Sequence, residues 1–235
     1  MERNRSVSCY SAAMATNTGR RRTSAGPVLQ SEVTDAIQTA FFEELAEVGY
    51  GRLSIDAVAK RAGVGKAAIY RRWRSKLDIT VALTSAVAVD AIDVPDTGGL
   101  RGDIRQYLEN ACEALTHPLA RHIVPDLLAE ATRNAALADA LLHTVRTPRR
   151  AKGAILFQRA IERGELSDES DLEMCMDLLA GPLYWRLTVV QTPTGADYLD
   201  RLTDSIMAAL TPDNRRDRAV PSSKRIVRGK QSGAR

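Results

Sequence analysis

The stretch LSIDAVAKRAGVGKAAIYRRWRSK, residues 53–76, constrains the fold more than any other part of the sequence. Ser54 can accept a hydrogen bond from an N–H of the turn that follows it, as the residue before a helix commonly does. Apolar residues then recur at helical spacing until Gly63, a residue type that ends helices because it adopts a positive φ at little cost. Gly65 opens a second short segment. We therefore predict two short helices joined by a tight turn.

The charges of this stretch indicate a surface that binds phosphate. Between Asp56 and Asp78 the sequence contains no acidic residue. The basic residues of the same interval are Lys60, Arg61, Lys66, Arg71, Arg72, Arg74 and Lys76. Solvated helix faces normally mix both signs of charge, so a run of one sign on a short two-helix unit is typical of proteins that bind nucleic acid.

Two other interpretations of the stretch are weaker. The segment GVGKAA could be a phosphate-binding nucleotide loop, but Lys60 stands where such a loop needs its first glycine. Ala67 also stands where the loop needs serine or threonine. The basic run could be an ordinary soluble surface, but the helix–turn–helix spacing of cap and glycines argues against that interpretation.

Residues 33–77, about a fifth of the chain, resemble the DNA-binding domain of TetR-type transcriptional repressors, and the resemblance weakens beyond them. The residues that match the family's spacing are Phe41, Phe42, Gly49, Tyr50, Ser54, Ile69, Tyr70, Trp73 and Lys76. One departure is Arg74, where many members carry a small residue or proline. It adds positive charge to the unit.

The basic face and the resemblance together predict how the unit contacts DNA. We expect the second short helix to lie in the major groove, where side chains meet base edges. The residues expected at bases are Lys66, Tyr70 and Arg71, with Gly65 and Ala67 allowing a close approach. The residues expected at phosphates are Ser54, Arg72, Arg74 and Lys76.

The rest of the chain predicts an all-α fold, because no alternation of period two persists. The expected parts are a disordered basic arm over 1–27, a helix-turn-helix DNA-binding domain over 28–76, a helical ligand-binding and dimerisation domain over 77–211, and a disordered basic tail over 212–235. The other helices are expected at Val28–Val48, Lys76–Val94, Leu100–Leu115, Pro148–Arg163, Asp171–Val190 and Ala196–Leu210. Gly181-Pro182 is expected to interrupt the fifth of these, and Asn134 to mark a helix end.

Charge is distributed unevenly along these parts. The net charges of residues 1–27, 28–76, 77–211 and 212–235 are +4, +2, −8 and +6. A basic DNA-binding unit with an acidic body suits a protein that meets DNA with one face. The three cysteines show no metal or disulfide spacing, and no run approaches the ~18 apolar residues of a membrane span. We therefore expect a cytoplasmic protein without a membrane partner.

An enzyme needs a set of chemically matched residues, and the sequence contains none that we can identify. It lacks G-x-S-x-G, H-E-x-x-H, C-x-x-C and a complete dinucleotide-binding fingerprint. His117 and His122 are five residues apart, a poor spacing for two metal ligands on one helix. We therefore predict no catalytic residue, metal or cofactor. The alternative is a small helical enzyme or carrier whose basic patch is incidental.

The TetR resemblance implies a small-molecule pocket and a dimer interface in the body. It also implies that an effector shifts the helix following the DNA-binding unit and changes the separation of the two units on DNA. The candidate pocket residues are Tyr107, Cys112, His122, Phe157 and Trp185, and the expected effector is small and apolar or amphipathic. The candidate dimer residues are Leu178, Pro182, Trp185, Val189, Leu202 and Ile206, on the last two helices.

The arm before the first helix has two interpretations. Its Arg20-Arg21-Arg22 sequence directly precedes the helix and can reach a neighbouring minor groove or the DNA backbone. Alternatively the arm is a flexible tail that makes no specific contact. The sequence favours neither.

Overall fold

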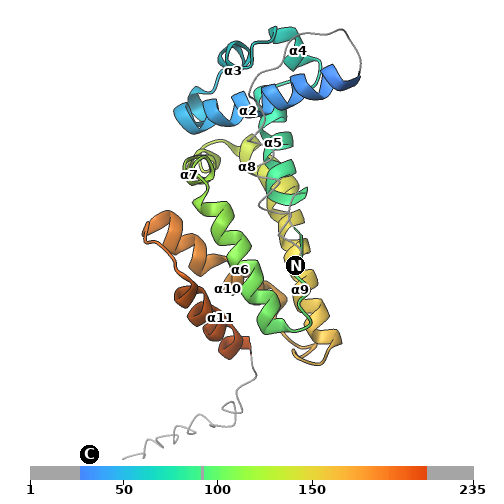
Figure 1. The fold of residues 1–235 in the computed structure, drawn as a ribbon, viewed down its shortest axis with the longest axis vertical. Helices are drawn as coiled ribbons and strands as arrows, with labels where there is room; N and C mark the ends of the chain where they lie inside the picture. The colour runs from blue at the N-terminus through green and yellow to red at the C-terminus, as the bar shows by residue number, and fades with distance from the viewer. Residues whose placement is uncertain (1–26, 91–92, 211–235) are drawn as a thin grey trace, which may run out of the picture.

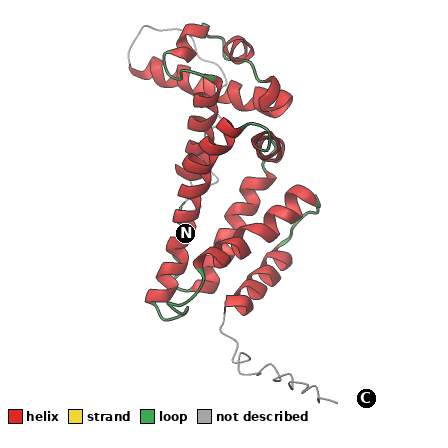
Figure 2. Cartoon of the chain, turned by 180° about the vertical axis from the view of Figure 1, so that it is seen from behind, coloured by secondary structure: helices red, strands yellow, loops and turns green. Residues whose placement is uncertain are grey.

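The computed structural model of the chain describes residues 27–90 and 93–210. Every regular element within these ranges is helical, which confirms the all-α prediction (Figure 2). The expected arm and tail, and the arginines of the arm, lie outside the described residues. No helix within the ranges is both long and apolar enough to cross a membrane.

Three helices form one end of the molecule (Figure 1). The first is α2, Pro27–Arg52, whose backbone leaves helical geometry at Gly49. It is followed by α3, Ile55–Arg61, and by α4, Lys66–Tyr70. We call these three helices the reader. The expected first helix ended at Val48, whereas α2 continues past the kink at Gly49 to Arg52.

The chain leaves the reader through α5, Lys76–Ser85, which continues as a π-helical turn over Ala86–Asp90. The expected helix ended at Val94, and its last residues include the two that the structure does not describe. Helix α6, Leu100–Thr116, then returns toward the reader, and α7, Ala120–Ala131, crosses beneath α2 (Figure 1).

A long continuous rod follows α7. It consists of α8, Ala135–Leu141, a π-helical turn over Leu142–Arg146, and α9, Thr147–Glu162. Asn134 caps the start of the rod, because its Oδ1 accepts a hydrogen bond from the N–H of Leu137 at 3.1 Å. The asparagine therefore marks a helix end as expected, namely the beginning of α8.

The last two helices are α10, Leu172–Tyr184, which continues as a π-helical turn over Trp185–Val189, and α11, Ala196–Leu210. The bounds of α11 confirm the sequence prediction. Both helices pack on α6 at the end of the molecule farthest from the reader (Figure 1).

The expected interruption at Gly181-Pro182 is wrong, because α10 runs through it. A proline inside a helix costs roughly 3 kcal/mol, since it removes a hydrogen bond and crowds the preceding turn. Leu179 and Leu183 flank the pair and are completely buried in the body. Burying both side chains offsets a cost of that size, and the geometry departs from the α-helix only afterwards, at Trp185–Val189.

Two hydrophobic cores hold the helices together. The first lies between α2, α3, α4 and α5, and it includes Ile123 and Leu127 of α7 and Leu137 of α8. The second lies between α6, α9, α10 and α11. The sequence placed the end of the DNA-binding domain at residue 76, but the core of the reader includes side chains beyond it. Helix α7 contributes to this core, although α6, which precedes α7 in the chain, belongs to the second core.

Candidate nucleic-acid interface

Helices α3 and α4 form a helix–turn–helix whose local signals are those seen in the sequence. The Oγ of Ser54 accepts a hydrogen bond from the N–H of Asp56 at 3.2 Å and caps α3. Gly63 ends the turn after α3 with φ 66°, and an added Cβ would have free space there, so the positive φ alone requires glycine. Gly65 precedes α4 in an extended conformation.

The inner face of α4 is fixed by the first core. Ile69 is completely buried, and the half-buried Trp73 packs against the same cluster. Four residues on the opposite side of α4 and its C-terminal turn are exposed: Lys66, Ala67, Tyr70 and Arg71. We call these four the reading surface. Tyr70 is 44% exposed, a large fraction for an aromatic side chain without a partner protein.

An acidic residue lies next to the reading surface. Asp56, on the first turn of α3, forms an ion pair with Lys66, with 2.6 Å between Oδ1 and Nζ. The hydrogen bond to this carboxylate raises the pKa of the Lys66 ammonium. Both side chains are at least half exposed, so the pair contributes little to stability. It does, however, neutralise a cation expected to meet DNA.

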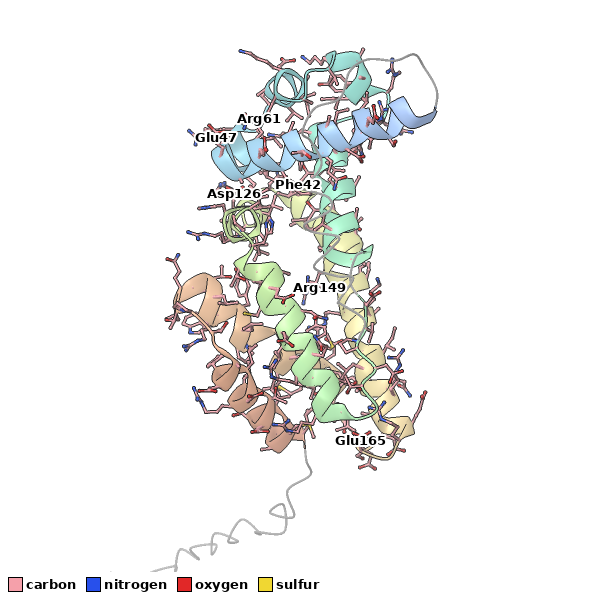
Figure 3. All side chains as sticks on the ribbon, viewed as in Figure 1. Phe42, Glu47, Arg61, Asp126, Arg149 and Glu165 are labelled. Atoms are coloured by element: carbon pink, nitrogen blue, oxygen red, sulfur yellow. The ribbon has the colours of Figure 1, made fainter. Side chains whose placement is uncertain are left out.

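Arg61 is also paired with acidic residues that precede the basic run in the sequence. Its guanidinium lies 2.8 Å from Glu44 and 2.5 Å from Glu47 (Figure 3), and 3.6 Å from Glu43, all on α2. Hydrogen bonds to Glu47 and then Glu44 raise its pKa. The interval that lacks acidic residues in the sequence is therefore not free of them in space.

Two of the expected phosphate ligands have partners inside the protein. The Nε of Arg72 donates to Thr34 Oγ1 on α2 at 3.0 Å, and its NH1 donates to the carbonyl of Ala68 at 2.9 Å. The ammonium of Lys76 donates to the carbonyl of Tyr50 at 2.9 Å. Their phosphate contacts stay predictions, but both residues also hold α2 in place.

Two cations that follow α4, Arg71 and Arg74, differ from Arg72 and Lys76 in having no partner among the described residues. Neither guanidinium forms a hydrogen bond or ion pair with any residue in the described ranges, and both residues are exposed. The backbone N–H of Arg74 donates to Asp78 at 3.1 Å, which fixes the chain where α5 begins. Exposed guanidinium groups without protein partners are available to phosphate and to guanine. Ser54, Gly65 and Ala67 are exposed on the same unit.

The structure separates the residues expected to line a pocket. Tyr107 and Phe157 are buried in the second core, and Cys112 packs against it with its Sγ 2.8 Å from Thr194 Oγ1. His122 is exposed on α7 and Trp185 is 61% exposed, so neither faces the interior with the other three. The expectation that His122 and Trp185 line a pocket with the other three is therefore corrected. It rested on the type of each residue and not on the direction in which its side chain points.

The expected dimer residues also separate into two groups. Leu178 and Pro182 are half-buried and Trp185 and Val189 are exposed, and together with the exposed Met174 they recur along one side of α10 and its π-helical turn. We call these five residues the α10 stripe. Ile206 is only 2% exposed and packs inside the chain with α6, and Leu202 packs against the same core. The expectation that Ile206 faces a partner is therefore wrong.

Comparisons with known proteins agree along both parts of the chain. Residues 37–83 match the family model described as bacterial regulatory proteins, tetR family, and residues 94–206 match the model described as tetracyclin repressor-like, C-terminal domain. An uncharacterised HTH-type transcriptional regulator of Mycobacterium tuberculosis is 34% identical over 163 residues, which cover 69% of this chain and 80% of that protein.

Two further relatives extend the comparison. A DNA-binding transcriptional repressor TetR of Mycobacteroides abscessus is 31% identical over 179 residues, covering 74% of this chain and 92% of the repressor. A crystal structure of a TetR family transcription regulator superposes with a TM-score of 0.59 at 28% identity, covering 77% of this chain and 100% of that chain. The similarity to these two proteins therefore covers both the reader and the helical body.

Proposed function

The chain belongs to the TetR family of transcriptional regulators, and from that membership we propose that it is a repressor that binds an operator as a homodimer and leaves it when a small molecule binds the body. The observation that carries the proposal is the reading surface, which presents Arg71 directly after the short helix α4 without a partner among the described residues. The repressor role is supported by the relative from Mycobacteroides abscessus, which is named a transcriptional repressor.

A dimer is expected from the size of α4. A helix of five residues, Lys66–Tyr70, presents few side chains to base edges. Two copies related by a two-fold axis double these contacts and read two half-sites at a set spacing. The α10 stripe supports the same conclusion, because Met174, Trp185 and Val189 leave a continuous apolar surface in contact with water along one side of the helix.

The direct test is selection of binding DNA from a random pool with the full-length protein. A repressor of this kind should enrich a two-fold symmetric sequence. Transcription from a promoter that contains this sequence should increase when the gene that encodes the repressor is deleted. Effectors should be small and apolar or amphipathic, and they should raise the melting temperature while releasing the selected DNA. Enrichment of no sequence would contradict the proposal and favour the helical enzyme or carrier.

Replacing Arg71 with alanine should weaken binding to the selected operator by about 1–3 kcal/mol, because a guanidinium in the major groove pairs with guanine through two hydrogen bonds. Arg74→Ala provides the matched control, since Arg74 is equally free but is expected at a phosphate. Gel shifts with operator and scrambled DNA measure both. Arg71→Ala should reduce the ratio of the two affinities and Arg74→Ala should not. An unchanged ratio for Arg71→Ala would contradict the base contact.

Replacing Asp56 with asparagine should strengthen DNA binding, because Lys66 would no longer have to leave a carboxylate to reach a base edge, and a carboxylate that repels the DNA phosphates would be removed. The slope of log affinity against log salt should become steeper, because more of the positive charge of the reader becomes available to the DNA. Glu47→Gln is the control, since it removes the same charge from the reader at an acid paired with Arg61. If both variants change the slope equally, the effect comes from net charge and not from the Lys66 pair.

A further inference from the structure

Two other helices contact the backbone of Tyr50 near the C-terminal end of α2. The N–H of Tyr50 donates to Asp126 Oδ2 on α7 at 2.7 Å. The carbonyl of Tyr50 accepts from the ammonium of Lys76, the first residue of α5, at 2.9 Å. That ammonium also lies 4.5 Å from the centroid of the Tyr50 ring. The two contacts join the reader to α7 and to α5.

The backbone at this point is built around the carboxylate of Asp126. Gly49 has φ 75° and ψ 164°, which turns the chain out of the helix just before Tyr50. A Cβ added to Gly49 would lie 2.5 Å from Asp126 Oδ1, so the carboxylate would have to move away from the backbone. Glycine is required here for its φ, and its lack of a Cβ lets the carboxylate approach the backbone. The carboxylate of Asp126 therefore packs against the backbone of Gly49 and also accepts the hydrogen bond from the N–H of Tyr50.

Apolar packing around the carboxylate brings α7 close to α2 without fixing their relative position. Ile123 and Leu127 lie on the same side of α7 as Asp126 and are buried in the first core with Phe42 of α2. Figure 3 shows Asp126 directly beneath the ribbon of α2, near Phe42. Apolar contacts are not directional, so side chains of this kind tolerate small displacements of one helix along another. A hydrogen bond at 2.7 Å requires a defined distance and angle.

We propose that Asp126 is a positioning residue that fixes the orientation of the reader on the body and thereby the half-site spacing that a dimer binds. The inference rests on the proposed function and deepens it. The chain itself connects reader and body only through α5, and the apolar packing of α7 and α8 against the reader is not directional, so it tolerates small movements of the reader. The bond from α7 to Tyr50, 76 residues away in the sequence, adds a directional contact to this packing and restricts those movements.

The first test uses DNA selected by the wild-type protein, a single half-site from it, and versions whose half-sites are one base pair closer or farther apart. Asp126→Ala should bind the half-site within about twofold of wild type, whereas its preference for the selected spacing should fall from about tenfold to about threefold or less. Asp126→Asn keeps an acceptor oxygen and should restore the preference. Asp139→Ala, the same change at an exposed residue of α8, is the control.

The second test does not depend on DNA. A spin label introduced through a non-natural amino acid at the exposed Lys60 of each reader reports the distance between the two readers of a dimer. Asp126→Ala should broaden the distribution of this distance, and Asp126→Asn should narrow it again. Wild-type spacing preference together with a wild-type distance distribution in Asp126→Ala would overturn the inference. If the wild type selects no DNA, the proposed function fails, and the distances still decide the role of Asp126.

Discussion

Replacing Trp185 with glutamate is expected to convert the dimer into a monomer that no longer binds its operator tightly. Trp185 is the most exposed large apolar side chain among the described residues, and it lies on the α10 stripe between Pro182 and Val189. In a two-fold interface each substitution appears twice, so the contact would contain two buried charges without partners. Tryptophan is also among the residues that contribute most to interfaces, each costing about 2 kcal/mol or more when removed.

The loss of pairing should appear directly as a loss of operator affinity. Specific sites are typically bound about 10³–10⁷ times more tightly than random DNA, and a monomer that reads one half-site loses most of that difference. Sedimentation measures the mass and gel shifts measure the affinity. Ile155→Glu is the control, because Ile155 is an exposed apolar residue on α9, outside the α10 stripe. A dimeric Trp185→Glu, or a monomeric wild type that still binds the operator tightly, would contradict the interface.

The second large effect is expected on stability, from replacing Asp103 with alanine. Asp103 is completely buried on α6, and its Oδ2 lies 3.0 Å from a guanidinium nitrogen of Arg163. Its Oδ1 accepts from the N–H of Thr97 at 2.6 Å and from the Thr97 hydroxyl at 2.8 Å. Alanine would remove all three acceptor contacts, so Arg163 would keep only its ion pairs with Asp96 and Glu165 and the segment at Thr97 would lose its attachment to α6. Hydrogen bonds to charged groups of this kind predict a loss of about 2–4 kcal/mol.

A matched control for Asp103 is Asp204 on α11. Asp204 lies 2.8 Å from Arg101, but both side chains are more than half exposed. Exposed ion pairs contribute about 0–1 kcal/mol, so Asp204→Ala should be nearly neutral. Thermal unfolding at one fixed protein concentration compares the two, because dimerisation makes the melting temperature depend on concentration. Equal stability of Asp103→Ala and wild type would show that the buried contacts are replaced by water.

Features governed by neighbouring residues could be predicted from the sequence. Ser54 caps α3, Gly63 ends its turn with a positive φ, and Gly164 does the same after α9. Helix α11 begins and ends where the periodicity of apolar residues placed it. Each of these depends on contacts within a few residues along the chain, where a side chain competes for a backbone hydrogen bond or a face repeats every 3.6 residues.

The surroundings of a charged residue could not be predicted in the same way. A run without acidic residues indicated a cationic surface, and the reading surface exists, but Asp56 folds against Lys66 and three glutamates of α2 surround Arg61. Residue type also failed to show whether a side chain points into the body or toward solvent. Trp185 is exposed, whereas Ile206 is buried. Direction depends on which helices pack together, and local propensity does not decide that.

The sequence by itself determined that this protein is helical, that residues 53–76 form a helix–turn–helix, and that one face of this unit is basic. Only the tertiary structure decided that α10 continues through Gly181-Pro182, because the burial of its flanking leucines offsets the local cost of proline. It alone also placed Asp126 on the N–H of Tyr50. Caps and turns depend on a few consecutive residues, whereas contacts between residues 76 positions apart exist only once the cores have brought the helices together.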